Sequence, residues 1–143
     1  MSVPRVAYLV EQCWHRVPGG TAVATAEIAN ALIRRSDIEL KGIAAWHKIP
    51  PNVQLPEDLH INHSKLPRQL LYSFWQSLNR PRVETLIEDV DLVHASGGAI
   101  PPTQLPFIST IYDLSWRHDP SWFPSRGRHF AEEWLQKSYR ADL

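Results

Sequence analysis

The chain has 143 residues, of which 43% are hydrophobic and 21% charged, a balance that suits one folded domain and excludes a disordered chain or two full domains. Fifteen basic and fifteen acidic residues give no net charge and so no overall attraction to nucleic acid, and we expect no nucleic-acid partner. The single cysteine, Cys13, excludes an internal disulfide and a multi-cysteine zinc site, and is typical of a reducing compartment such as the cytoplasm.

No exported or membrane-spanning segment is expected. The apolar run near the N-terminus turns acidic at Glu11 and is too short for a signal peptide. The longest uncharged stretch, residues 95–112, contains three prolines and cannot form a membrane helix. The sequence therefore predicts a soluble protein.

The first predicted elements are a strand and a helix joined by a glycine-containing loop. Residues 6–10 form a continuous apolar run typical of a strand buried on both faces, and Gly19 and Gly20 close the loop that follows. Thr21 is a suitable N-cap for the helix. The apolar face of that helix repeats at four-residue spacing through Ala24, Ile28 and Leu32.

The middle of the chain predicts two further strands and two helical pieces. Residues 38–45 read as the second strand, and a proline-rich loop leads to a short strand near Ile61. Pro81 stops the next helix and starts another. The apolar residues of these two helices are Leu70, Leu71, Phe74, Trp75, Leu78, Val83, Leu86 and Ile87.

The last third predicts two buried strands and a final helix. The apolar runs at residues 91–94 and 107–112 read as strands, separated by a loop that contains glycine and proline. One stripe of the final helix consists of Phe130, Ala131, Trp134, Leu135 and Ser138. Strands alternating with helices predict an α/β fold, a Rossmann-like, doubly wound parallel sheet. Ligands of such sheets bind beyond the carboxyl ends of the strands, so we expect chemistry in the loops that follow them.

Gly19-Gly20-Thr21 lies between a strand and a helix, where free backbone N–H groups and the helix dipole can hold a phosphate. The alternative is that the two glycines only make a tight turn. The GxGxxG pattern and the acidic residue that a dinucleotide fold requires are both missing from the sequence, as is the lysine-bearing phosphate loop. A nicotinamide-dependent dehydrogenase is therefore not expected.

Tyr112, Asp113, Ser115 and Trp116 follow the last predicted strand and offer both hydrogen-bonding groups and aromatic faces. Sugars need both kinds of contact, so this segment is a candidate sugar site. The alternative is a surface loop in which Asp113 only caps a turn.

The seven histidines and the tryptophans of the helical stripes are interpreted structurally. His60 with His63, or His118 with Asp119, are conceivable metal ligands, but no HExxH pattern accompanies them, and we expect no metal site. Trp75 and Trp134 are expected in the core.

Taken in order, several segments resemble the N-terminal domain of GT-B glycosyltransferases, in the retaining group 1 set that includes many mannosyltransferases. The resemblance spans essentially the whole chain. The segments that carry it are the first strand with Gly19-Gly20-Thr21 and its helix, Phe74-Trp75-Gln76 before Arg80-Pro81, Asp91-Leu92-Val93-His94-Ala95, Ser109 to Trp116, Pro120-Ser121-Trp122-Phe123-Pro124, and Arg126-Gly127-Arg128.

The resemblance implies that residues 1–143 are an incomplete acceptor-side domain and that the C-terminal donor domain is missing. Gly19, Gly20 and Thr21 would then approach the diphosphate of a nucleotide-sugar donor. Tyr112, Asp113, Ser115 and Trp116 would line the site for the sugar or for a carbohydrate acceptor such as a glycan or a lipid-linked sugar. The nucleotide sugar is a substrate, and no cofactor is implied.

Tyr112 marks a departure from this family, which often has histidine immediately before the aspartate of this motif. No catalytic residue is therefore assigned, and we expect the chain alone to be inactive. The resemblance implies a cytoplasmic protein that can make peripheral contact with the inner face of the membrane. The competing interpretation is a non-catalytic, Rossmann-like binding or interaction module.

Overall fold

The sheet that the apolar runs predict is present in the computed structural model, which describes residues 2–142. All five strands run in parallel, in the order β3-β2-β1-β4-β5. Their bounds are β1 Arg5–Leu9, β2 Glu39–Trp46, β3 Ile61–Pro67, β4 Leu92–Ala95 and β5 Phe107–Ser109. The chain moves outward from β1 to β3 and then returns to place β4 and β5 on the other side of β1. This order confirms an α/β fold with a Rossmann-like parallel sheet.

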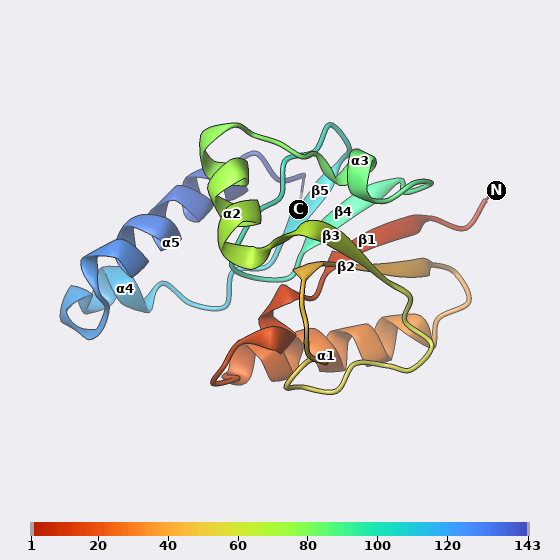
Figure 1. Cartoon of the computed structure of the whole chain (residues 1–143), viewed down its shortest axis with the longest axis horizontal. Coiled ribbons are helices and arrows are strands. Elements are labelled where there is room, and N and C mark those ends of the chain that lie inside the picture. Colours follow the sequence, from red (N-terminus) through yellow and green to blue (C-terminus); the bar gives the residue numbers. More distant parts are fainter. Residues whose placement is uncertain (1, 143) are drawn as a thin grey trace.

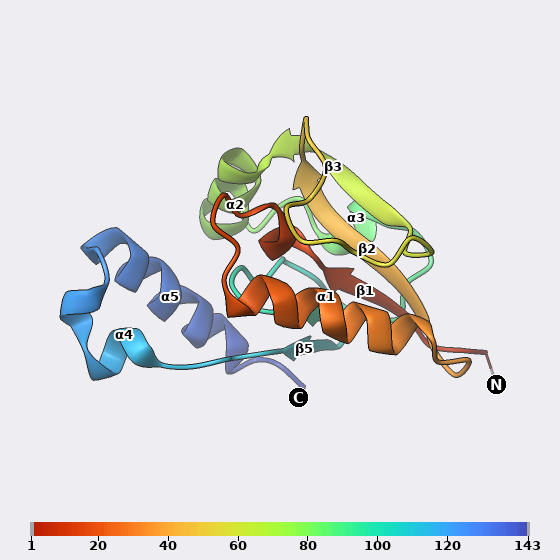
Figure 2. The ribbon, with the colours of Figure 1, turned by 90° about the horizontal axis from the view of Figure 1, so that it is seen from below.

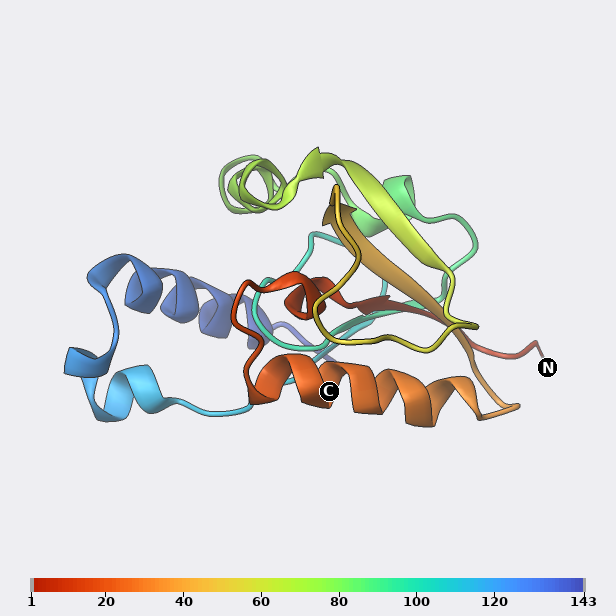
Figure 3. The same cartoon turned by 60° about the horizontal axis from the view of Figure 1, so that its bottom comes forward.

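The helices cover the two faces of the sheet and one of its ends (Figure 1). Their bounds are α1 Gly20–Ile33, α2 Arg68–Ser77, α3 Val83–Leu86, α4 Ser115–His118 and α5 Ser125–Ser138, with short 3-10 helices η1 Glu11–Trp14 and η2 Pro120–Trp122. Figure 3 shows α1 below the sheet and α2 with α3 above it. In Figure 2, α4 and α5 extend from the end of the sheet that lies opposite the N-terminus.

The predicted last strand is shorter than the apolar run suggested. β5 ends at Ser109, whereas the run continues to Tyr112. The neighbouring strand β4 ends at Ala95, and its carbonyl accepts the last ladder bond, from the Thr110 N–H at 2.9 Å. Residues 111 and 112 therefore have no strand beside them and leave the sheet, although their side chains are apolar.

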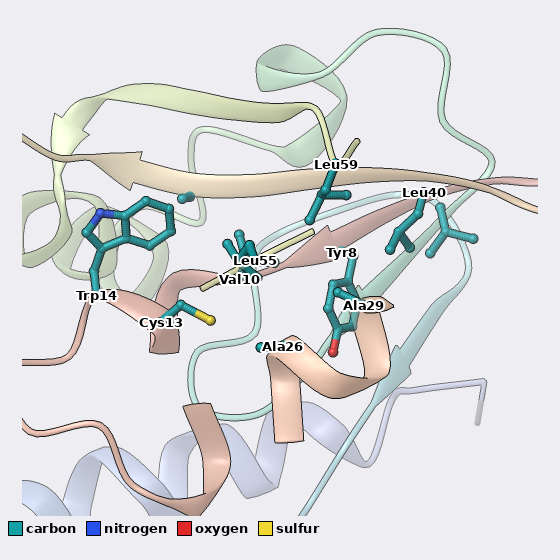
Figure 4. Close-up of a cluster of buried hydrophobic side chains, with 11 residues drawn as sticks. Tyr8, Val10, Cys13, Trp14, Ala26, Ala29, Leu40, Leu55 and Leu59 are labelled. Atoms are coloured by element: carbon teal, nitrogen blue, oxygen red, sulfur yellow. The ribbon is translucent and has the colours of Figure 1, made fainter. Parts of the chain in front are cut away.

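Alternate residues of β1 supply the two halves of the core, as expected for a strand covered on both faces. Val6, Tyr8 and Val10 pack toward α1 with Leu40 and Leu55. Figure 4 shows Tyr8, Val10, Leu40 and Leu55 above α1, with the Tyr8 ring directed toward the helix. The Tyr8 hydroxyl donates a hydrogen bond to the Thr25 carbonyl at 3.0 Å, which satisfies its polar atom inside the core.

On the opposite face, Ala7 and Leu9 of β1 pack with Leu71, Trp75 and Val83 from α2 and α3. Trp75 is 2% exposed, which confirms its predicted place in the core. Its indole N–H donates to the Pro81 carbonyl at 3.1 Å. This bond ties the end of α2 to the segment that leads into α3.

The N-terminus and the buried face of α1 differ from the prediction. Gly19 occupies the N-cap position, and Thr21 is the second residue of the helix, so the prediction of Thr21 as N-cap is wrong. The residues that face the sheet most closely are Ala22, Ala26 and Ala29. Small side chains let the helix axis approach the sheet, while the predicted larger residues lie half-buried at the margin of this contact.

Within residues 2–142, no helix combines the length and the apolar composition that crossing a membrane requires.

Candidate functional site

A cavity of about 550 Å³ lies at the carboxyl ends of the strands, and we call it the strand-end cavity. Gln12 of η1 and Thr21 of α1 contribute to its wall, together with Gly97 and Gly98 after β4. The segment from Ser109 to Trp116 and one side of α5 complete it. The cavity therefore occupies the place where parallel α/β sheets bind ligands.

The four residues predicted as a sugar site all line this cavity: Tyr112, Asp113, Ser115 and Trp116. They reach it because the chain leaves the sheet after β5 and turns into α4. The strand ends place them near Thr21, although about ninety residues separate the two segments in the sequence. The fold thus brings together the two segments that the sequence analysis singled out.

Asp113 has a structural role in this wall. It accepts hydrogen bonds from the Ser115 N–H at 2.8 Å and from the Ser115 hydroxyl at 2.5 Å. These bonds lower the pKa of the carboxyl group, so Asp113 is ionised at neutral pH. One carboxylate oxygen, Oδ1, makes both contacts, which matches the predicted turn cap. Asp113 is exposed to solvent, so its other carboxylate oxygen needs no hydrogen-bond partner within the protein.

Aromatic side chains form much of the remaining wall. The predicted stripe of α5 lines the cavity through all five of its residues, Phe130, Ala131, Trp134, Leu135 and Ser138. Only Leu135 among them is buried, while Trp134 is half-buried: it packs against the core cluster, as expected, and also borders the cavity. The stripe also contacts α2, where the Tyr72 ring centroid lies 6.0 Å from that of Phe130 and 6.1 Å from that of Trp134.

An ion pair fixes α4 to α5 and so holds the cavity wall in place. The Arg117 guanidinium pairs with Glu132, and the Trp116 indole N–H donates to the same carboxylate at 3.3 Å. The Arg117 contact is the main cause that lowers the pKa of Glu132 to about 2. These contacts orient the Trp116 ring at the cavity.

The two glycines at the start of α1 have a different environment from the one expected. Thr21 lines the strand-end cavity, but Gly19 and Gly20 do not belong to its wall. A Cβ atom added to either glycine would meet no described atom within 4 Å, and neither residue has a positive φ. Neither packing nor backbone conformation therefore requires glycine here. Within residues 2–142 no side chain caps this helix, so its first N–H groups are open to a ligand.

A second pair of glycines was missed as a site element. Gly97 and Gly98 follow β4 with φ values of +126° and +76°, where other residues are strained. A Cβ on Gly97 would lie 2.7 Å from the Tyr112 ring, and one on Gly98 would lie 3.0 Å from the Gln12 amide nitrogen. These glycines let the loop after β4 pass close to Tyr112 on one side and to Gln12 on the other. The signal was available, since two adjacent glycines follow a predicted strand here as they do at residues 19 and 20.

Glu11 was also missed as a site element. Its side chain is fully buried and accepts the Ala45 N–H at 2.8 Å. The His47 ring lies within 2.9 Å of the same carboxylate, and Arg68 Nε lies 3.9 Å from it. A carboxylate immediately after a buried strand, at the ligand-binding edge of the sheet, was the signal that could have identified it.

The comparisons add nothing to this geometry. Family models, curated proteins and solved structures give no match for this chain.

Across the part of the chain that the structure describes, no three His, Cys, Asp or Glu side chains are grouped as metal ligands would be. The function must therefore be argued from the cavity and the residues around it.

Proposed function

We propose that this chain is the acceptor-side domain of a retaining GT-B glycosyltransferase. It binds a carbohydrate acceptor, such as a glycan or a lipid-linked sugar, while a second domain holds the nucleotide-sugar donor. The observation that carries the proposal is the strand-end cavity, in which Asp113 and Ser115 lie beside the aromatic side chains Trp116 and Trp134. Polar groups next to aromatic rings suit a ligand that has hydroxyl groups on the edge of its ring and C–H groups on its faces.

The start of α1 supports a place for the donor beside this cavity. Thr21 reaches the cavity wall, and the glycines before it leave open space in front of the helix N-terminus. N–H groups and the positive end of the helix dipole stabilise a diphosphate. When the acceptor hydroxyl attacks the anomeric carbon, the sugar leaves that diphosphate, and charge develops on the leaving group. Backbone donors at Gly20 and Thr21 would stabilise that charge.

The division between two domains predicts the behaviour of the 143-residue chain on its own. We expect these 143 residues to transfer no sugar, because the proposed mechanism needs a donor domain outside them to close over the donor and exclude water. The measurement is transfer of a radiolabelled sugar from each common nucleotide sugar to a mixture of glycan acceptors. Specific transfer by the purified chain would contradict the proposed division. A chain that neither transfers a sugar nor binds one would favour a non-catalytic interaction module.

A further inference from the structure

The wall of the strand-end cavity also contains polar side chains. Gln12, His15 and Arg68 are among its lining residues. Gln12 belongs to η1, His15 follows that helix directly, and Arg68 is the first residue of α2. The strands that precede these residues, β1 and β3, have β2 between them, and the contact of Arg68 with Glu11 of η1 shows that the two segments meet beyond the strand ends.

The Arg68 guanidinium has donors that the protein does not use. Its side chain is 35% exposed, and its contact with a carboxylate is the one to Glu11, at 3.9 Å from Nε. In residues 2–142 no group accepts a hydrogen bond from this side chain, and its Nη1 atom is buried without a partner. A buried donor without a partner is costly, and a bound ligand or an ordered water can supply the missing acceptor.

Glu11 holds Arg68 in place without consuming those donors. The carboxylate is fully buried and is already engaged by the Ala45 N–H and the His47 ring. It therefore attracts the Nε side of Arg68, whose side chain borders both the strand-end cavity and a second hollow around Trp46 and Lys48. A guanidinium held in this way is suited to a phosphate or carboxylate, whose paired oxygens match its fork of N–H groups.

Gln12 supplies a second unused polar atom to the same cavity. The residue is 4% exposed, and its carbonyl oxygen Oε1 has no hydrogen-bond partner among the described residues. Its amide nitrogen packs close to Gly98. A buried acceptor and a guanidinium in the wall of one cavity fit a ligand that carries both a hydroxyl group and an anionic group.

We infer that Arg68 is the anion-binding residue of the strand-end cavity and that the acceptor carries a phosphate or a carboxylate. The anionic group binds the Arg68 guanidinium, an acceptor hydroxyl donates to Gln12 Oε1, and the sugar ring extends toward Trp116 and Trp134. This inference rests on the proposed function, because only that proposal makes the bound ligand a sugar acceptor. It goes beyond that proposal by naming the charge class of the substrate and the residue that selects it.

His15 provides a reporter of the bound anion. Partial desolvation of its ring, and next the positive charge of Arg68, lower the pKa of His15, while the negative charge of Glu11 acts in the opposite sense. An anion bound to Arg68 would offset the effect of the arginine. The pKa of His15 should therefore rise when the site is filled, and a neutral sugar should leave it unchanged.

The test is an NMR titration of the 143-residue chain with five probes: inorganic phosphate, glucose 6-phosphate, glucuronate, glucose and GDP. We expect the phosphate sugar or the carboxylate sugar to shift the Gln12 side-chain amide and to raise the pKa of His15, and glucose to bind more weakly. The better of the two anionic sugars identifies the anionic group. Arg68→Gln should weaken that binding by about 10-fold or more.

Arg34→Gln is the matched control, because Arg34 is exposed at the other end of α1. It should bind the probes as the unmodified chain does. If Arg68→Gln does not fold, Arg68→Lys keeps the charge but loses the fork and should also bind more weakly. Equal binding of glucose and the anionic sugars, unchanged binding by the Arg68 variant, or stronger Arg68 dependence for GDP would each overturn the inference. No step measures transfer, so these results are independent of whether the chain belongs to a transferase.

Discussion

Replacing Gly20 by valine in the proposed full-length transferase should lower sugar transfer by about 100-fold or more, because the side chain would keep the diphosphate away from the backbone donors, and losing such a donor to a developing negative charge typically costs that much. The valine side chain would stand at the open N-terminus of α1, where the diphosphate is proposed to bind. Its effect on stability should be small, because the added Cβ meets no described atom within 4 Å and the backbone has no positive φ. The measurement is kcat/KM for the donor together with the unfolding temperature.

Gly127→Val is the control for that substitution. Gly127 lies in the first turn of α5, as Gly20 does in α1, and an added Cβ makes only an ordinary contact of 3.6 Å with Pro124. Transfer should be retained in this variant. Near-normal transfer by Gly20→Val would show that the loop at residues 19 and 20 is only a turn.

Removing the Glu11 carboxylate should produce the largest loss of stability. Glu11→Ala leaves the Ala45 N–H and the His47 ring without their shared acceptor inside the protein. A buried donor left without its partner costs roughly 1–3 kcal/mol, so two of them give an expected loss of about 2–6 kcal/mol in the free energy of unfolding. Urea denaturation measures it.

Two further variants separate this effect from a general loss of charge. Glu27→Ala removes an exposed carboxylate of α1 and should be close to neutral. Glu11→Gln keeps an acceptor oxygen at the site and should recover part of the stability. If Glu11→Ala were as stable as Glu27→Ala, the buried carboxylate would have no structural role. The proposal that Glu11 holds Arg68 in place would then be contradicted as well.

The sheet could be predicted from the sequence because buried parallel strands are continuous apolar runs. The run at residues 6–10 needed no tertiary information, since both faces of a central strand are covered. The end of β5 could not be predicted in the same way. Residues 111 and 112 are as apolar as a strand requires, and only the end of β4 at Ala95 determines that they leave the sheet.

The candidate site was predictable in part. The segment from Tyr112 to Trp116 was found because polar and aromatic residues follow a strand, and the structure places it in the cavity wall. The role of the α5 stripe was missed, because a helix that faces a hollow has the same periodicity as one that faces a core. Arg68 was missed because only the fold brings it near Glu11, 57 positions earlier in the chain.

The strand-end cavity as a carbohydrate site is tested most directly by mapping amide chemical shifts of the 143-residue chain as carbohydrates are added. We expect shifts concentrated on Asp113, Ser115, the Trp116 and Trp134 indole groups, and Thr21, all of which line the cavity. Trp46 and Lys48, which line a second hollow that shares Arg68 with the strand-end cavity, should stay unchanged. Shifts confined to that second hollow, or no shift with any neutral or anionic carbohydrate, would contradict the account.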